Sequence, residues 1–413
     1  MPFLQWLPGR RFHSASRGLW GIWTAIAAIV LPISVPAQTF QTTAPQAILV
    51  DAGTRSILFE KNADERLTPA SMAKTMTAEI VFNEIKSGRL SLDKEFMVSE
   101  NAWRKGGGPS GGPAMFAKVN SAVRLEDLLR GLIVQSGNDA AIAIAEGISG
   151  TEENFAKLMN ERAKEIGLKS ASFRNATGLS DPQQKVSARD LATLAQHVIE
   201  TYPELYKMFG EQEFTWNKIR QRNRNPLLTM DIGADGLKSG NTEEAGYGLT
   251  GSAVQSGQRL IVVVNGLKTA QERSGEARKL LEWGFRSFES RAIFSDQDVI
   301  GDAKVFGGSQ SSVPLVAMKP VRVLMPRGEA QRLSARIRYI GPLKPPVAKG
   351  TQVARLEIDR GDVRALEIPL YAAEDVGVGT IRQRAFDGLV EFSTGWARRA
   401  ASNALSSLSS RIR

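Results

Sequence analysis

Residues 68–74 read TPASMAK, and this stretch indicates both where a helix starts and which chemistry the chain can carry. Thr68 is a favoured N-cap residue and Pro69 a favoured first helical residue, so the stretch predicts the start of a helix. Ser71 then lies in the first turn, where unpaired N–H groups and the helix dipole favour negative charge. Lys74 follows three residues later on the same helix face. A lysine can activate a serine when burial or a second cation depresses its pKa.

A Ser-x-x-Lys match means little by itself, because residues 91–94 read SLDK and match as well. Residues 135–140 (QSGNDA) give the first match its context. They place Ser136 and Asn138 on either side of a glycine, at a turn between two helical stretches. A hydroxyl and an amide can project from such a turn into one cleft, as proton relay and hydrogen-bond donor.

Residues 235–242 (DGLKSGNT) supply the remaining groups. Lys238 is a second cation that would help to keep Lys74 neutral. Ser239 offers a hydroxyl to a substrate carboxylate, and Gly240 allows another segment to approach the strand closely. The three segments together predict a serine that is activated by lysine rather than by histidine.

The composition of the 413-residue chain is that of a globular protein, with 42% hydrophobic and 23% charged residues. The chain contains no cysteine, which excludes disulfides, iron–sulfur clusters, thiolate zinc sites and a cysteine nucleophile. Of its two histidines, His13 lies in a segment that we expect to be removed. A Ser-His-Asp triad or a multi-histidine metal site would depend on His197 alone, and the helical context of His197 indicates a structural role. We expect no metal and no cofactor.

Residues 1–37 contain the three parts of a secretory signal. Arginines come first, an apolar run from Leu19 to Leu31 follows, and small residues precede a cleavage site after Ala37. The run is too short for a comfortable transmembrane span, although an uncleaved anchor of marginal length is the alternative. The net charge of +10 is spread along the chain. Spread charge and export together argue against a nucleic-acid partner.

The middle of the chain predicts an α/β (α+β) domain, with one sheet flanked by helices. Residues 47–60 are typical of a hairpin, residues 69–206 have helical periodicity, and strands return near 247–254 and 260–264 before a helix through Leu280. Short β-rich runs between Gly and Pro turns then predict a small all-β sandwich domain. The expected parts are a signal peptide at 1–37, a catalytic domain at 38–289, a β-rich domain at 290–379 and a terminal helix at 380–413.

The terminal segment has the pattern of an amphipathic helix that lies in a membrane interface. Apolar residues such as Trp396 recur at helical spacing through residues 386–412, and Arg398 and Arg399 are among the residues that add basic charge. We expect this helix to attach the protein to a membrane surface. Packing of the helix back onto its own domain is the alternative.

In the order of these segments the chain resembles the penicillin-binding, serine-type D-alanyl-D-alanine carboxypeptidases of bacterial cell walls, the low-molecular-weight or peptidase S11 type. The resemblance runs from about residue 46 to residue 288. It rests on short motifs: SMAK at 71–74, QSGND at 135–139, NATGL at 175–179, SARD at 187–190, DGLKSG at 235–240 and LLEWGF at 280–285. It implies a serine β-lactamase/DD-peptidase-like catalytic domain, followed by a β-rich domain and an amphipathic anchor.

The resemblance implies an acyl-enzyme mechanism on peptidoglycan stems that end in D-Ala-D-Ala. Ser71 would attack the peptide carbonyl, Lys74 would take its proton, and Ser136 would pass a proton to the departing D-alanine. Asn138 would hold Lys74 and the substrate amide. Backbone N–H groups of Ser71 and Asn241 would hold the oxyanion. The residues implied in binding the substrate are Asn138, Lys238, Ser239, Asn241 and Arg273, with Ser239 and Arg273 near its terminal carboxylate.

The resemblance also implies β-lactams as covalent inhibitors and a peripheral place on the periplasmic face of the bacterial inner membrane. A β-lactamase or a D,D-endopeptidase could use the same serine–lysine site, and a scaffold protein could keep the fold without turnover. Arg273 argues against an endopeptidase, which needs no clamp for a terminal carboxylate. The β-rich extension and basic tail argue against a freely diffusing β-lactamase. The intact set of site residues argues against a scaffold.

Overall fold

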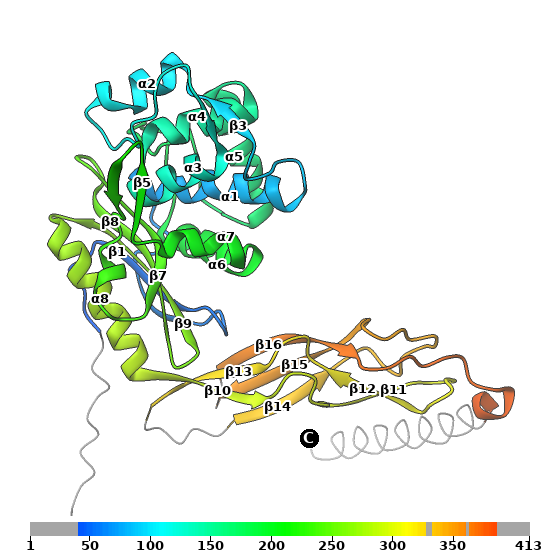
Figure 1. The fold of residues 1–413 in the computed structure, drawn as a ribbon. Helices are drawn as coiled ribbons and strands as arrows, with labels where there is room; N and C mark the ends of the chain where they lie inside the picture. The colour runs from blue at the N-terminus through cyan, green and yellow to red at the C-terminus, as the bar shows by residue number, and fades with distance from the viewer. Residues whose placement is uncertain (1–39, 328–332, 361–362, 386–413) are drawn as a thin grey trace, which may run out of the picture. The chain divides into compact units, whose positions relative to one another are not determined.

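The computed structural model describes residues 40–327, 333–360 and 363–385, and Figure 1 shows how their elements are arranged. The expected signal segment at 1–37 and residues 386–413 of the expected terminal helix lie outside the described residues. Among the helices that are described, none combines the length and the apolar composition needed to cross a bilayer.

A five-stranded antiparallel sheet with the strand order β2-β1-β9-β8-β7 lies at the centre of the first domain. Its strands are β1 (Gln46–Asp51), β2 (Ile57–Lys61), β7 (Ala234–Thr242), β8 (Gly246–Gln255) and β9 (Gln258–Leu267). The hairpin of β1 and β2 opens the fold, as the sequence predicts. β7 is an edge strand, so within the described chain one side of its backbone has no neighbouring strand.

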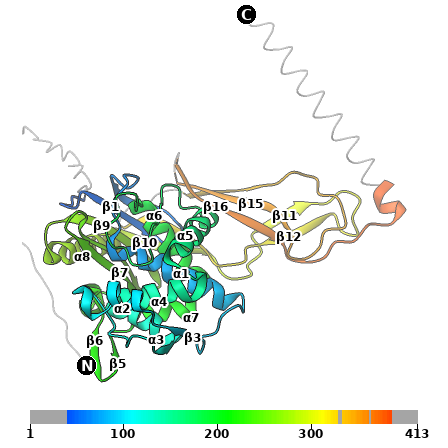
Figure 2. The same ribbon diagram turned by 90° about the horizontal axis from the view of Figure 1, so that it is seen from above.

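Alternate side chains of the sheet enter two different cores. Ile261 and Val263 of β9 pack with the helical block, whereas Val262 packs under α8 (Ala270–Ser287). α8 contacts β8 and β9, and it buries Leu280 against them. Helices therefore cover both faces of the sheet (Figure 1 and Figure 2). This confirms the predicted architecture of one sheet flanked by helices.

The helical block lies between β2 and β7 in the sequence. Its longer helices are α1 (Lys74–Lys86), α4 (Asn138–Ser149), α5 (Glu152–Ile166) and α6 (Ala188–Thr201). Its short helices and turns are η1 (Ala70–Ala73), α2 (Glu100–Gly106), η2 (Gly108–Ser110), α3 (Leu125–Arg130), η3 (Gly131–Gln135), α7 (Pro203–Tyr206), η4 (Lys207–Gly210) and η5 (Pro226–Thr229). Its two small hairpins are β3 (Glu95–Met97) with β4 (Ala122–Arg124) and β5 (Glu213–Trp216) with β6 (Ile219–Arg222).

The start of α1 differs in detail from the expectation. The helix is entered through the 3-10 turn η1, and Pro69 occupies the position before this turn without a side-chain cap. The Thr68 hydroxyl instead donates to Glu244 (3.2 Å) and accepts from Lys185 (2.8 Å). Lys185 and Glu244 also form an ion pair with each other. The prediction that Thr68 caps the helix is therefore wrong, because this tertiary ion pair competes for its hydroxyl.

From β10 (Phe288–Phe294) onward the strands form a separate β domain. β10 pairs with β13 (Val321–Pro326), and a second sheet has the order β11-β12-β16-β15-β14. The strands of that sheet are β11 (Gly301–Lys304), β12 (Ser312–Val316), β14 (Leu333–Arg338), β15 (Gln352–Arg360) and β16 (Val363–Ala372). Side chains of both sheets, among them Val323 and Leu356, share one apolar core. The predicted all-β domain is thus confirmed.

Candidate active site

Ser71 and Lys74 lie together where the chain enters α1. Lys74 Nζ is 3.2 Å from Ser71 Oγ, so a proton can pass directly between the two groups. Ser71 belongs to the 3-10 turn, and Lys74 is the first residue of the α-helix. The Lys74 side chain is buried, which keeps water away from its amine.

Two glycines allow neighbouring segments to pack against the backbone of Ser71. A Cβ added to Gly240 of β7 would lie 2.8 Å from the Ser71 nitrogen. A Cβ added to Gly178, whose φ is +83°, would lie 1.9 Å from the Ala70 carbonyl oxygen. Ala70 itself has a left-handed backbone, with φ 48°. The edge strand β7 and the turn at Gly178 therefore both pack directly against the backbone of the segment that carries Ser71.

Neutral oxygen atoms surround the amine of Lys74. Nζ donates to Asn138 Oδ1 (2.7 Å) and to the backbone carbonyl of Thr177 (2.5 Å). Burial lowers the pKa of Lys74 well below its usual value, and the positive charges of Lys238 and Arg224 lower it further. A lowered pKa makes the neutral amine available as a proton acceptor, which is the state that activation of a serine requires.

Lys238 and Ser239 lie on β7, the strand that packs beside Ser71. Burial, together with the charges of Arg224 and Arg273, lowers the pKa of Lys238 to about 7. The Ser239 hydroxyl donates to the Arg224 carbonyl (2.8 Å), which fixes the loop that carries Arg224 against the strand. Lys238, Arg224 and Arg273 thus lie near one another beside β7, and a substrate carboxylate placed among them would favour the charged form of Lys238.

Ser136 and Asn138 flank a glycine in the turn between η3 and α4. Ser136 has a left-handed backbone, with φ 65°, and its buried Oγ has no hydrogen-bond partner among the residues described. Asp139 fixes this turn, because its carboxylate accepts the N–H groups of Met115 (2.9 Å) and Ala117 (3.1 Å). An unpaired buried hydroxyl costs free energy, and such costs concentrate at sites where a substrate supplies the partner.

Arg273 reaches the site from α8, on the opposite side of the sheet from α1. Its side chain is 9% exposed, and its guanidinium lies 5.7 Å from the ring centre of Tyr247. Its Nε has no hydrogen-bond partner in the described parts of the chain. Tyr247 of β8 pairs with Asn241 of β7. The structure thus brings Arg273 near the end of β7 that carries Asn241, with donor capacity left for an anion.

Sequence reasoning gave no role to Asn175, Thr177 or Arg224. The Asn175 amide oxygen accepts hydrogen bonds from the N–H groups of Thr177 (3.2 Å) and Gly178 (2.8 Å). These bonds fix the turn in which the Thr177 carbonyl accepts from Lys74. The signal for this turn was present, because an asparagine followed by a glycine three residues later is typical of an Asx turn. Arg224 gave no signal, since it acts by its charge from a loop that only the fold brings close.

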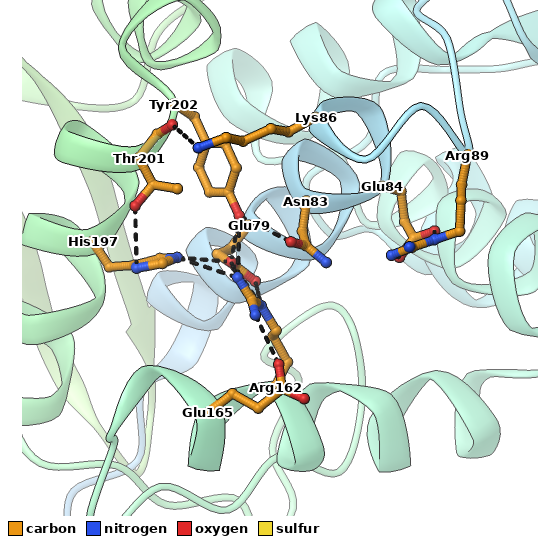
Figure 3. A network of polar contacts seen from close by, with 10 residues as sticks. All are labelled: Glu79, Asn83, Glu84, Lys86, Arg89, Arg162, Glu165, His197, Thr201 and Tyr202. Carbon is orange, nitrogen blue, oxygen red and sulfur yellow. Dashed lines mark hydrogen bonds and ion pairs between the residues drawn. The ribbon is translucent and has the colours of Figure 1, made fainter. Parts of the chain in front are cut away.

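His197 of α6 belongs to a polar network around Glu79, which lies further along α1 than Lys74. Figure 3 shows this network. Its Nε2 is 3.0 Å from Glu79 Oε1, and the same oxygen accepts from Arg162 (2.9 Å) and Tyr202 (2.9 Å). Burial alone would raise the pKa of Glu79, but hydrogen bonds from these three partners hold it below its usual value. The network joins α1, α5 and α6, so His197 has the packed, structural surroundings that its sequence context predicts.

Known proteins share both domains. The family described as D-alanyl-D-alanine carboxypeptidase matches residues 33–269, and the C-terminal domain of penicillin-binding protein 5 matches residues 288–378. D-alanyl-D-alanine carboxypeptidase DacC of Escherichia coli is 38% identical over 385 residues, which cover 91% of this chain and 96% of the relative. DacA of Haemophilus influenzae is 37% identical over 366 residues, which cover 87% and 90%. The chain therefore belongs to the serine-type D-alanyl-D-alanine carboxypeptidases.

Solved structures agree with the sequence comparison. Penicillin-binding protein 5 from Haemophilus influenzae has a TM-score of 0.75 and 38% identity, over 83% of this chain and 99% of that chain. Penicillin-binding protein 6B from Escherichia coli has a TM-score of 0.66 and 34% identity, over 82% and 98%. Within the family, the chain thus has the two-domain form of penicillin-binding protein 5. The resemblance inferred from the sequence motifs is confirmed.

Proposed function

We propose that this carboxypeptidase removes the terminal D-alanine from peptidoglycan stem peptides through an acyl-enzyme on Ser71. The observation that carries the proposal is the buried Lys74 amine, 3.2 Å from Ser71 Oγ, among neutral acceptors and nearby cations. A lysine of lowered pKa beside a serine is an arrangement that activates the serine without histidine. The relatives' name, D-alanyl-D-alanine carboxypeptidase, supports the substrate.

The reaction needs two proton transfers in each half. Lys74 Nζ takes the proton of Ser71 Oγ as this oxygen bonds to the carbonyl carbon of the penultimate D-alanine. The peptide C–N bond then breaks, and the departing amine receives a proton that Ser136 passes on from Lys74. In the second half, a water molecule gives a proton to Lys74 as the water oxygen bonds to the acyl carbon. The bond between this carbon and Ser71 Oγ then breaks, and Lys74 returns the proton to Ser71. Backbone N–H groups of Ser71 and Asn241 hold the oxyanion, and each such donor contributes about 3 kcal/mol.

The substrate carboxylate distinguishes a carboxypeptidase from an endopeptidase. In this proposal Lys238, Ser239 and Arg273 bind the carboxylate, and Asn138 orients the substrate amide. In the described part of the chain the outer edge of β7 has no neighbouring strand, so its backbone groups can pair with the peptide. The cationic side chains of Lys238 and Arg273 would have no carboxylate partner if the enzyme cut only inside crosslinked peptides, so they favour the terminal reaction over the endopeptidase alternative.

The same site should accept β-lactams as covalent inhibitors. A related structure, penicillin-binding protein D2 from Listeria monocytogenes, has been solved in an ampicillin-bound form. It has 30% identity and a TM-score of 0.52 over 60% of this chain and all of that chain. This likeness supports the expectation that penicillin acylates Ser71.

We place the enzyme on the periplasmic face of the inner membrane, attached peripherally. The signal-like residues 1–37 support export, and the basic amphipathic pattern of residues 380–413 supports attachment. Between them the proposed limits are 38–289 for the catalytic domain and 290–379 for the β-rich domain. Deleting residues 380–413 should move the protein from the membrane fraction to the soluble fraction. Unchanged fractionation would contradict the anchor.

The deciding experiment measures D-alanine released from a pentapeptide that ends in D-Ala-D-Ala. The wild type, Ser71→Ala and Ser91→Ala are compared, since Ser91 belongs to the second Ser-x-x-Lys match. We expect release and labelling by a fluorescent penicillin from the wild type and Ser91→Ala, and neither from Ser71→Ala. Penicillin labelling without D-alanine release would favour the endopeptidase or scaffold alternative. Labelling of Ser71→Ala would disprove the assignment of the nucleophile.

A further inference from the structure

Exposed apolar side chains occur on neighbouring segments of the β domain. Ile340 is 96% exposed, Ile381 79%, Val378 57% and Phe306 37%. Single exposed apolar residues are ordinary, but several on adjoining segments mark an interaction surface. The domain already has its own core, so these side chains are not needed to fold it.

Two of these segments are joined at the end of β11. Phe306 N donates to the Leu343 carbonyl (2.9 Å), and Leu343 N donates to the Lys304 carbonyl (2.8 Å). Lys304 N in turn donates to the Tyr339 hydroxyl (3.2 Å). The turn that carries Ile340 therefore lies beside Phe306.

The third segment joins the same end of the domain. Gly379 N donates to the Gly307 carbonyl (2.9 Å), and Ser309 N donates to the Gly377 carbonyl (2.8 Å). The helical turn of residues 381–385, drawn in orange-red in Figure 2, follows directly. We call the resulting surface the tip surface; it consists of residues 304–309, 340–344 and 377–384.

The charges of the tip surface are all positive. Its segments contain no acidic residue, and the nearest acids along the chain, Asp302 and Asp375, lie outside it. Its basic residues form no ion pair within the described ranges. They are Lys304, Lys344, Arg382 and Arg384. Exposed apolar side chains among basic ones match the interface of a bilayer that contains anionic lipids.

We propose that the tip surface enters the interface of an anionic bilayer and attaches the β domain to the membrane directly. The proposal rests on the membrane association proposed above, and it adds a second contact to the terminal helix. The position of the tip surface supports this occupant, because the chain continues from residue 385 into the Arg-rich amphipathic segment. A single interfacial anchor is often weak and reversible, whereas two signals hold a protein stably.

The absence of cysteine from the whole chain allows a clean test. An environment-sensitive fluorophore is attached to Ile340→Cys in the full-length mature protein. The matched control is Met318→Cys, which is 60% exposed in the turn between β12 and β13. β12 connects the tip surface to this turn, so Met318 lies at the opposite end of that strand from the tip surface. Both proteins are mixed with phosphatidylglycerol-containing vesicles and with phosphatidylcholine vesicles, and co-sedimentation is measured in parallel.

We expect anionic vesicles to shift the emission at position 340 to the blue and to raise it at least about twofold, as interfacial burial of the label requires. The label at position 318 should not respond. Co-sedimentation without a response at 340 would overturn the tip contact and leave the helix anchor standing. No co-sedimentation would overturn both proposals. A blue-shifted label at 340 before vesicles are added would show that the chain itself or a second copy covers the tip surface, which also overturns the proposal.

A charge substitution tests the energetics independently. Phe306→Asp with Ile340→Asp should weaken binding to anionic vesicles by at least about tenfold, because two apolar groups no longer enter the interface. Met318→Asp should leave binding unchanged. Release of D-alanine from a soluble pentapeptide should stay the same in all three proteins, and this activity shows that each is folded. Equal vesicle binding by the double variant and the wild type would overturn the proposal.

Discussion

Helix α1 buries two ionisable side chains, Lys74 near its start and Glu79 little more than one turn later, and the two have opposite surroundings. Lys74 contacts neutral oxygens and lies near other cations, whereas Glu79 receives hydrogen bonds from Arg162, Tyr202 and His197. Both pKa values are lowered. A lowered pKa favours the neutral form of the lysine and the charged form of the glutamate. The same helix thus carries one amine that is able to accept a proton and one carboxylate that stabilises the packing of its neighbours.

The comparison teaches that burial alone does not decide what a charged residue does. An opposite charge nearby compensates the desolvation of Glu79, so the ion pair ties α1 to α5 and α6. No such compensation is given to Lys74 by its hydrogen-bond partners, which are an amide and a backbone carbonyl. The burial that no opposite charge compensates among these partners lies at Lys74, the proposed proton acceptor, and the stabilising contacts lie further along the same helix.

Removing Lys74, the proposed base, should have the largest effect on activity. Lys74→Met fills the same buried space without an amine, so D-alanine release should fall at least about a thousandfold. The midpoint of thermal unfolding should not fall, because a buried amine no longer has to be desolvated. Lys94→Met, in the exposed second match, should change neither quantity. Turnover that stays within tenfold of the wild type would show that Lys74 is not the base.

Removing the charge of Glu79, which its hydrogen-bond partners compensate, should lower stability rather than activity. Glu79→Gln should lower the free energy of unfolding by about 3–5 kcal/mol, because Arg162 loses its buried partner. Turnover per folded molecule should be retained. Glu84→Gln is the matched control on the same helix, and its pair with the exposed Arg89 should contribute less than about 1 kcal/mol. Urea unfolding measures both values, and equal losses would contradict the comparison.

The pH dependence of this stability has a definite sign. The pKa of Glu79 is lower in the folded than in the unfolded chain, so its contribution is fully present above the unfolded value. It is lost as the pH falls through the folded value. The difference in unfolding free energy between the wild type and Glu79→Gln should therefore shrink in acid. A difference that grows as the pH falls would contradict this account.

The turn behind Lys74 should have an intermediate effect on activity. Asn175→Ala removes the acceptor that holds the N–H groups of Thr177 and Gly178, so the carbonyl that binds Lys74 loses its fixed position. We expect kcat to fall by roughly tenfold to a hundredfold, as for other small displacements in active sites. Asn175→Asp keeps the acceptor oxygen and should restore most of the rate. Equal rates for the alanine and aspartate variants would exclude a positioning role.

The smallest effect should come from a distant charge. Arg224→Gln removes a cation that lowers the pKa of both Lys74 and Lys238. Without it the protonated lysine is favoured, so the acidic limb of the kcat/KM profile should move to higher pH. Arg222→Gln, two residues away and exposed, is the control and should leave the profile in place. A shift to lower pH would contradict the assignment of Lys74 as the base.

Sequence reasoning succeeded where contacts are local. The spacing of Ser71 and Lys74 predicted their contact because residues three apart share a helix face. The hairpin of β1 and β2 and the helices on both faces of the sheet followed from hydrophobic periodicity in the same way.

Sequence reasoning failed where a contact depends on the whole fold. Threonine is a residue type that often caps helices, but the Thr68 hydroxyl forms hydrogen bonds with the Lys185–Glu244 ion pair instead. The Thr177 carbonyl is a backbone group, and any residue type could supply it. The closeness of Arg273 to Tyr247 depends on α8 packing over the sheet, so residue pattern alone could not show it.

Gly178 and Gly240, which pack against the backbone at Ser71, limit the substitutions that the enzyme can accept. A side chain at position 178 or 240 would collide with the backbone that presents Ser71, so it could not narrow the site without moving Ser71. Selection by an inhibitor that acylates Ser71 therefore has no simple route through these positions. We expect variants that escape acylation and still turn over the substrate to carry both glycines unchanged.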